Sequence, residues 1–252
     1  MNVENWINQH TIFECVAGSQ AYGLSTPTSD QDFRGFCVPP IEYFYGPAKF
    51  EQKDGSWEDG ADRAIWNITK GVEMMLNGNP NVIELLFMPE DCIVKTSTWW
   101  GRIQDLRSSF LSQRIKSSYL GYSSSQWKRM SQDFQSPYKP KYASHLIRLL
   151  CQGIELLETG SLTVKLSGSD HEFCMDTKLG KKSNEEILEC ATFLMNELKQ
   201  AAEKTDLPAE PDREKVYAEL HELLNDFYGV SFRGTLPWEA HIRKELAKCN
   251  SK

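Results

Sequence analysis

The sequence lacks the features that would assign it to a membrane, secreted or zinc-binding class. No apolar run approaches membrane-spanning length, and the N-terminus has neither the basic nor the apolar region of a signal peptide. The 7 cysteines are scattered, without a Cys-x-x-Cys pair. This pattern argues against a zinc site or a disulfide framework and favours buried thiols in a reducing compartment. We therefore expect a cytoplasmic protein that does not bind membranes.

Basic residues and histidines are also few. The 28 Lys and Arg residues against 35 Asp and Glu residues give a formal net charge of -7. This balance argues against broad, sequence-independent binding to a nucleic-acid backbone, although it permits a local basic groove. The 5 dispersed histidines disfavour a phosphohydrolase built on His/Asp clusters. No Gly-x-Ser-x-Gly sequence is present to form the elbow of a serine nucleophile.

The first ninety or so residues show the alternation of strand and helix signals that is typical of an α/β unit. The predicted strands are Thr11–Ala17, residues 31–38, Lys49–Lys53 and residues 62–67, and a helix is predicted over Ile68–Leu76. A compact apolar run follows at residues 81–88 and contains one carboxylate, Glu84.

Helical spacing of apolar residues dominates the second half. It predicts helices over Ser97–Phe110, Ser112–Arg129, Lys141–Thr159, Ser183–Lys204 and Asp212–Phe227, with a small strand at Leu162–Leu166. Pro140 just before the third helix and Gly160 just after it are its start and stop signals, and Ser183 with Glu186 forms a capping box for the fourth. No flexible linker separates the halves. The sequence therefore predicts an α+β fold in which an α/β domain with a mixed sheet, residues 1–95, packs on a mainly helical region, residues 96–252.

The most informative pattern is a Gly-Ser turn followed by an Asp-x-Asp pair. Residues 18–24 read GSQAYGL and residues 29–35 read SDQDFRG. On a strand, Asp30 and Asp32 would share one face, where two close carboxylates repel unless a cation lies between them. Mg²⁺ accepts such oxygens together with a substrate's phosphates. Gly18 permits close backbone approach, and a helix opening just after Ser19 would direct N–H groups at an anion. The pattern predicts phosphoryl chemistry on a nucleotide.

This combination resembles the signature of the DNA-polymerase-β-type nucleotidyltransferase superfamily. Its longer form is similar to a branch of predicted nucleotidyltransferases related to the polymerase-β-like protein of a bacterial RNA-repair pathway. The resemblance implies metal-dependent transfer of an NMP from an NTP, with AMP from ATP expected. It also implies two Mg²⁺ ions, with Mn²⁺ as an alternative. The acceptor could be an RNA or tRNA end, a protein hydroxyl or a small molecule. A non-catalytic nucleotide-binding regulatory module of the same fold is the alternative interpretation.

Two-metal transfer usually needs a third carboxylate. In the resembling family an acidic residue on the strand before the Ile68–Leu76 helix has this role, which favours Asp62. Glu84 is the second possibility, but a structural carboxylate pairing Arg34 is the preferred interpretation of that residue, because a buried acid needs partners. Asp59 and Glu58 are further alternatives.

Cationic side chains complete the predicted site. Arg34, two residues beyond Asp32, could hold a triphosphate or orient a carboxylate through its forked guanidinium. In the helix that begins at Lys141, four polar residues follow at steps of four, three and four and form one stripe: Lys141, His145, Arg148 and Gln152. We expect Lys141, His145 and Arg148 to face Gly18 and Ser19 across a cleft and to bind triphosphate oxygens, whereas a solvated helix face is the alternative.

Overall fold

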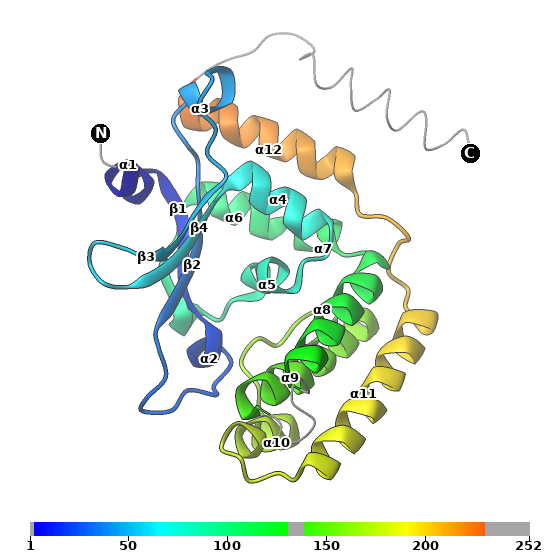
Figure 1. Ribbon diagram of the computed structural model, residues 1–252. Helices are drawn as coiled ribbons and strands as arrows, with labels where there is room; N and C mark the ends of the chain where they lie inside the picture. The colour runs from blue at the N-terminus through cyan, green and yellow to red at the C-terminus, as the bar shows by residue number, and fades with distance from the viewer. Residues whose placement is uncertain (1–2, 131–138, 230–252) are drawn as a thin grey trace.

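The computed structural model describes residues 3–130 and 139–229, and these form one mixed sheet and a set of helices (Figure 1). The predicted α+β class is confirmed, since the strands lie in the first half and the second half is helical. Within the described ranges, no helix is both long enough and apolar enough to cross a membrane. Described cysteines are free thiols, buried or half-buried, and Cys249 lies outside the described residues.

The sheet has five strands in the order β3-β4-β2-β1-β5. Their bounds are β1 Thr11–Ala17, β2 Asp32–Cys37, β3 Gln52–Ser56, β4 Asp62–Asn67 and β5 Ile93–Lys95. Neighbouring strands are antiparallel except for β2 and β4, which are parallel. Their register pairs Asp32 with Asp62 at the starts of the two strands. Since paired residues of adjacent strands point to the same face, the topology brings these two acids together.

Short helices precede, connect and follow the strands of the first half. They are α1 Val3–His10, α2 Gly18–Ala21, α3 Glu42–Tyr45, α4 Ile68–Leu76 and α5 Pro80–Ile83, with 3₁₀ turns at Glu84–Phe87 and Glu90–Cys92. Asn67 starts α4 by accepting a hydrogen bond from the Thr69 amide, and Asn79 caps α5 in the same way.

The second half consists of seven helices within the described residues: α6 Thr98–Asp105, α7 Arg107–Phe110, α8 Arg114–Met130, α9 Pro140–Thr159, α10 Gly168–Lys178, α11 Asn184–Lys204 and α12 Arg213–Tyr228. Helix α9 begins with Pro140 and ends at left-handed Gly160, as the sequence indicates. Ser183 and Glu186 form the predicted capping box of α11.

Several predicted boundaries were wrong. The strand expected at Lys49–Lys53 begins at Gln52, and the helix expected over Ser97–Phe110 is broken into α6 and α7. Residues 162–166 form no strand: Leu162 and Val164 are buried in alternation, but no neighbouring strand pairs with them. Helices α1 and α10 were not predicted. Helix α10 buries only Cys174 and Thr177, so it shows no apolar stripe.

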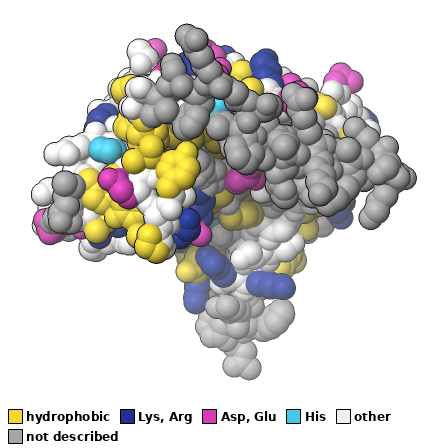
Figure 2. Space-filling model, turned by 90° about the horizontal axis from the view of Figure 1, so that it is seen from above, with side chains coloured by type: hydrophobic (Ala, Val, Ile, Leu, Met, Phe, Trp, Pro, Cys, Tyr) yellow, Lys and Arg dark blue, Asp and Glu magenta, His cyan; other side chains and the backbone are white. Residues whose placement is uncertain are grey.

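On one side of the molecule, hydrophobic side chains reach the surface. Figure 2 views the molecule from the side on which α3 and α12 lie in Figure 1, and hydrophobic side chains gather over part of that face. Tyr45 of α3 is 76 % exposed.

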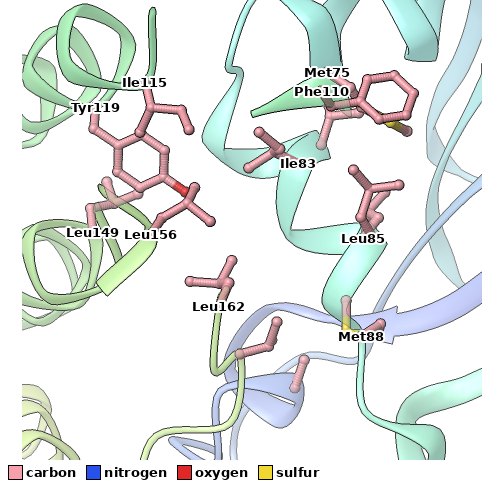
Figure 3. Close-up of a cluster of buried hydrophobic side chains, with 14 of the residues drawn as sticks. Met75, Ile83, Leu85, Met88, Phe110, Ile115, Tyr119, Leu149, Leu156 and Leu162 are labelled. Carbon is pink, nitrogen blue, oxygen red and sulfur yellow. The ribbon is translucent and has the colours of Figure 1, made fainter. Parts of the chain in front are cut away.

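One main hydrophobic core runs through both halves. In Figure 3, Tyr119 of α8 and Leu149 of α9 lie in the same cluster as Ile83 of α5. On the sheet, Trp100 of α6 stacks on Phe13, with 4.2 Å between ring centroids. The continuous core shows that the halves pack closely, as expected from the missing linker, while the division at residue 95 stays a prediction.

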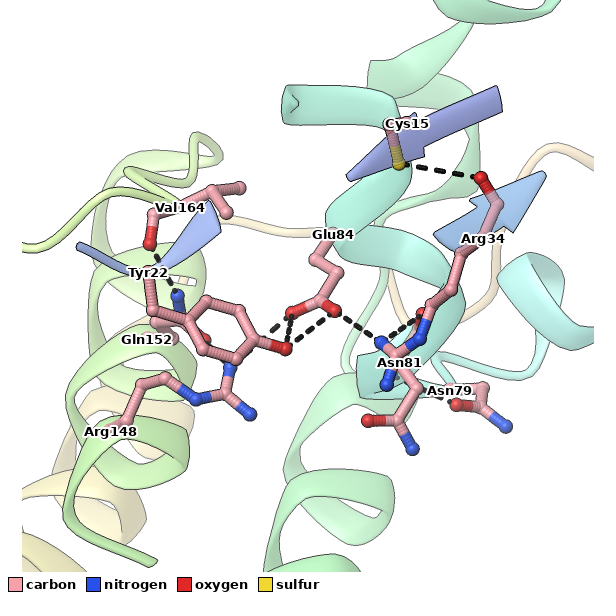
Figure 4. Close-up of polar contacts among 9 residues, drawn as sticks. All are labelled: Cys15, Tyr22, Arg34, Asn79, Asn81, Glu84, Arg148, Gln152 and Val164. Atoms are coloured by element: carbon pink, nitrogen blue, oxygen red, sulfur yellow. Dashed lines mark hydrogen bonds and ion pairs between the residues drawn. The ribbon is translucent and has the colours of Figure 1, made fainter. Parts of the chain in front are cut away.

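A buried polar cluster, the Glu84 network, joins the halves (Figure 4). Glu84 is 1 % exposed. It accepts hydrogen bonds from the Tyr22 hydroxyl at 2.8 Å, from an Arg34 terminal nitrogen at 2.7 Å and from an Arg148 terminal nitrogen at 3.3 Å. Arg148 also donates to Gln152 at 2.5 Å, and its guanidinium lies 3.7 Å from the centroid of the Tyr22 ring. One carboxylate thus connects β2, the segment after α2, and α9.

Glu84→Gln tests this network. The amide keeps the shape of the side chain but leaves two guanidiniums without their counter-charge. Because breaking a buried ion pair by removing one partner costs about 3–5 kcal/mol, we expect the free energy of unfolding to fall by that amount. Urea denaturation measures it, with exposed Glu90→Gln as the matched control. A loss no larger than that of the control would show that the network does not stabilise the fold.

Candidate active site

Two cavities meet at the end of the sheet where β2 and β4 begin. The first, of about 280 Å³, lies between the Gly-Ser turn and helices α9 and α10. The second, of about 290 Å³, lies over β2, β4 and β3. They share Asp32, Arg34 and Asn81 as a common wall.

The structure brings the sequence-predicted site residues together around this wall. Eight of them line the first cavity: Gly18, Ser19, Asp30, Asp32, Arg34, Lys141, His145 and Arg148. The ninth, Asp62, lines the second cavity beside Asp32. Asp59 and Glu58 line neither cavity, and Asp59 is held by Arg63 at 2.7 Å.

Gly18 places the turn against an acid. Its φ of +63° lies in the left-handed region, and a Cβ built there would come within 2.6 Å of Asp32 Oδ2. Only glycine accommodates both conditions. The helix opens at Gly18 rather than just after Ser19, and it is a single turn. Such a short helix carries little macrodipole, so its contribution to anion binding is its unpaired N–H groups and the Ser19 hydroxyl.

The geometry of the acids differs from the prediction in one respect. Asp30 and Asp32 were expected to share a strand face, but β2 begins at Asp32, and Asp30 is an exposed loop residue. The neighbour of Asp32 on the sheet face is Asp62, across the parallel β2–β4 pair. Adjacent strands lie about 4.8 Å apart, so these two side chains start from neighbouring backbone positions.

Electrostatics at Asp32 reflect this crowding. Burial raises the pKa of the Asp32 carboxyl, Arg34 opposes the increase, and the nearby negative charges of Asp62 and Asp30 add to it. A cation between the acids would relieve the repulsion and favour the charged form.

The donor set fits a magnesium-type ion. Across the described parts of the chain, no three His, Cys, Asp or Glu side chains form a ready-made metal cage. Mg²⁺ does not require one, because it usually binds through one or two carboxylates, water and the phosphates of a substrate. Asp32 with Asp62 or Asp30 provides such a partial set of oxygen ligands.

Glu84 is not part of this acidic group, since Tyr22, Arg34 and Arg148 hold its carboxylate in the interior. This agrees with its interpretation as a structural carboxylate that pairs Arg34. Arg34 and Arg148 line the first cavity while bonded to Glu84, and Arg148 is only 2 % exposed. Two guanidiniums around one carboxylate leave an excess positive charge in the cavity wall. Their direct contact with a phosphate stays a prediction.

The predicted stripe of α9 divides into three environments. Lys141 is exposed at the cavity, and His145 lies half-buried behind it. Burial, reinforced by Arg148 and Lys141, lowers the pKa of His145 to about 3. His145 is therefore neutral near pH 7 and offers a hydrogen bond rather than a charge. Gln152 points inward, bonded to Arg148 and 3.4 Å from the Val164 carbonyl oxygen.

Sequence reasoning missed Lys178, which lines the first cavity from α10. Its ammonium donates to the Leu24 carbonyl oxygen at 2.6 Å, and burial together with Lys141 lowers its pKa. No signal in the sequence could have shown it, because α10 has no apolar periodicity. Tyr22 and Asn81 were also missed, although both belong to segments that the motif analysis quoted.

The pKa of His145 makes stability depend on pH. Between about pH 3 and 6.5 the unfolded chain binds a proton at this residue and the folded chain does not. The stabilisation is therefore complete above pH 6.5 and is lost as the pH falls. We expect His145→Gln to lose less unfolding free energy than the parent protein between pH 7 and about pH 4.5, measured by urea denaturation. An equal loss in both proteins would contradict the assignment.

Comparison with known proteins identifies the family of the chain. The family described as RNA repair pathway DNA polymerase beta family (RlaP) matches residues 1–226. A relative in Enterobacteria phage T4, the "Uncharacterized 38.9 kDa protein in nrdC-mobD intergenic region", is 31% identical over 122 residues. The match covers 44% of this chain and only 36% of that relative's length. Because the family matches most of its length, the chain belongs to the RNA repair pathway DNA polymerase beta family.

Proposed function

We propose that this protein is a metal-dependent nucleotidyltransferase that moves an NMP from an NTP, with ATP the first candidate, to an acceptor hydroxyl. Family membership supports a nucleotidyltransferase-like function in general. The observation that carries the finer proposal is the first cavity, where the Gly18 turn lies against Asp32 and the cations of α9 line the opposite wall.

The triphosphate would lie between the turn and α9. Ser19 would donate a hydrogen bond to a phosphate oxygen, and Lys141 offers an exposed ammonium at the same cavity. Arg148 adds charge from the wall, where its Nε has no hydrogen-bond partner within the described residues. Positively charged and N–H groups fixed before the substrate arrives stabilise the charge that develops on phosphate oxygens.

The acids would hold the metal. Asp30, Asp32 and Asp62 are the proposed ligands, with Asp62 as the third carboxylate. When bound, two Mg²⁺ or Mn²⁺ ions would neutralise phosphate charge and lower the pKa of the acceptor hydroxyl. Asp62 lines the second cavity, so we place the acceptor there, on the far side of Asp32 from the triphosphate.

The reaction is then an in-line displacement. The acceptor oxygen forms a bond to the α-phosphorus as the bond to the β-phosphate oxygen breaks, and pyrophosphate leaves. The protein's own contribution is positioning and charge neutralisation. The acceptor could be an RNA or tRNA end, a protein hydroxyl or a small molecule.

Radiolabel transfer tests the proposal and searches for the acceptor. The protein is incubated with Mg²⁺, each α-labelled NTP and either total RNA or cell lysate. We expect stable label on one class of molecule and release of pyrophosphate. Tight NTP binding with no transfer under any of these conditions would favour the alternative, a non-catalytic nucleotide-binding module.

Replacing each of the three proposed metal ligands with asparagine tests their role in the transfer reaction. Asp30→Asn, Asp32→Asn and Asp62→Asn each remove one charge at nearly constant volume. We expect transfer to fall by on the order of 10²-fold or more, the scale of losing a group that stabilises developing charge. Exposed Asp105→Asn is the control. The unfolding midpoint should be unchanged, and near-normal turnover by the Asp32 variant would refute the metal assignment.

A further inference from the structure

Helix α10 holds the segment that leads into Asp30. The His171 ring donates from Nε2 to the Gly23 carbonyl oxygen at 2.8 Å. Two turns further along the helix, Lys178 donates to the Leu24 carbonyl oxygen at 2.6 Å. Two consecutive carbonyl groups of the segment are thus bound by side chains of one helix, near residues that line the first cavity.

The same lysine reaches the residue next to Asp30. Lys178 Nζ lies 3.3 Å from Ser29 Oγ. Ser29 closes a small turn with Thr26, because its hydroxyl accepts the Thr26 amide at 2.9 Å and its own amide donates to the Thr26 carbonyl oxygen at 2.9 Å. Lys178 therefore contacts the chain two residues before this turn, at Leu24, and again at its last residue, Ser29, which immediately precedes Asp30.

Asp30 depends on this turn for its position. Pairing of β2 with β1 begins at Asp32, so no sheet hydrogen bond holds Asp30. Among the described residues, no hydrogen bond or ion pair fixes its side chain. An exposed carboxylate on an unpaired residue is free to move unless the backbone before it is held.

We propose that Lys178 and His171 are positioning residues, which hold the segment Gly23–Ser29 so that Asp30 stays beside Asp32 at the cavity. The role of Asp30 as a metal ligand rests on the proposed function, whereas the immobilisation of the segment does not. A compact ammonium with three donors suits the task, since two donors reach the segment and one is left over.

Lys178 could instead act directly on an anion, because it lines the cavity. The two roles separate in a double variant with Ser29→Ala, which removes the acceptor of Lys178 next to Asp30 together with the hydroxyl that closes the Thr26 turn. If Lys178 positions the segment through Ser29, Lys178→Met speeds amide exchange less in the Ser29→Ala background than in the parent protein. If it acts only on an anion, Lys178→Met leaves amide exchange of the free protein unchanged in both backgrounds.

Amide hydrogen exchange of the free protein is the primary test. We expect Lys178→Met and His171→Ala to speed exchange in residues 23–30 by about tenfold, with the core strands unchanged. His171→Gln keeps an N–H donor and should restore protection. The matched control is Lys181→Met. Lys181 is an exposed lysine just after the end of α10, and it pairs with Asp176 within that helix. Unchanged exchange in residues 23–30 of the Lys178→Met protein would overturn the proposal.

Mn²⁺ titration followed by electron paramagnetic resonance tests the link to Asp30. Mn²⁺ binding should weaken about tenfold in Lys178→Met and in Ser29→Ala, approaching the loss expected in Asp30→Asn. Full Mn²⁺ affinity in both variants, or a weakened affinity for inorganic triphosphate as the only change, would contradict positioning. Faster exchange and weaker Mn²⁺ binding in a protein that transfers no nucleotide would support this inference while refuting the proposed function.

Discussion

The structure depends on one buried carboxylate. Glu84 lies in the apolar interior between the sheet and the helices, where an unpaired charge would cost several kcal/mol. Its oxygens are satisfied only when Arg34 from β2, Arg148 from α9 and the Tyr22 hydroxyl converge on it. Together with the continuous hydrophobic core, the network therefore holds the two halves at a fixed distance. The cavity between them has Arg34 and Arg148 of this network in its wall.

Charge is distributed unevenly around that cavity. The acids gather where β2 and β4 begin, and the cations come from α9 and α10. In a chain with a net charge of -7, this local separation would allow the proposed polyanion and cation to bind side by side. Gly18 sets the closest approach, since any side chain there would displace the Asp32 carboxylate. The turn and the acid thus form one unit rather than two neighbouring motifs.

Local patterns predicted local structure well and long-range geometry less well. The apolar stretch Thr11–Ala17 and the capping box of α11 were predicted to the residue, because strand alternation and caps depend on near neighbours. Asp30 was expected to lie on a strand, but the strand begins two residues later, at Asp32. The Thr26–Ser29 turn keeps Asp30 out of the strand, and the pattern of apolar and polar residues does not reveal this turn.

Helical spacing likewise showed that Lys141, His145 and Arg148 share a side of α9. It could not show that this side of α9 runs from solvent at Lys141 into the interior at Arg148 within two turns. It also could not show that Arg148 forms an ion pair with the buried Glu84. The positions of Lys178 and His171 depend on how α10 packs against a distant loop, and α10 itself carries no apolar stripe. These contacts join segments that are far apart in the sequence, so local sequence patterns do not predict them.

The most direct measurement is the position of metal and phosphate in a crystal of the protein with Mn²⁺ and a non-hydrolysable ATP analogue. Anomalous scattering locates the ion without reference to any assumed ligand. The account predicts an ion bound by Asp32 and at least one of Asp62 and Asp30, with the triphosphate against Ser19 and facing Lys141. An analogue bound outside this cavity, or an ion that does not touch Asp32, would contradict it.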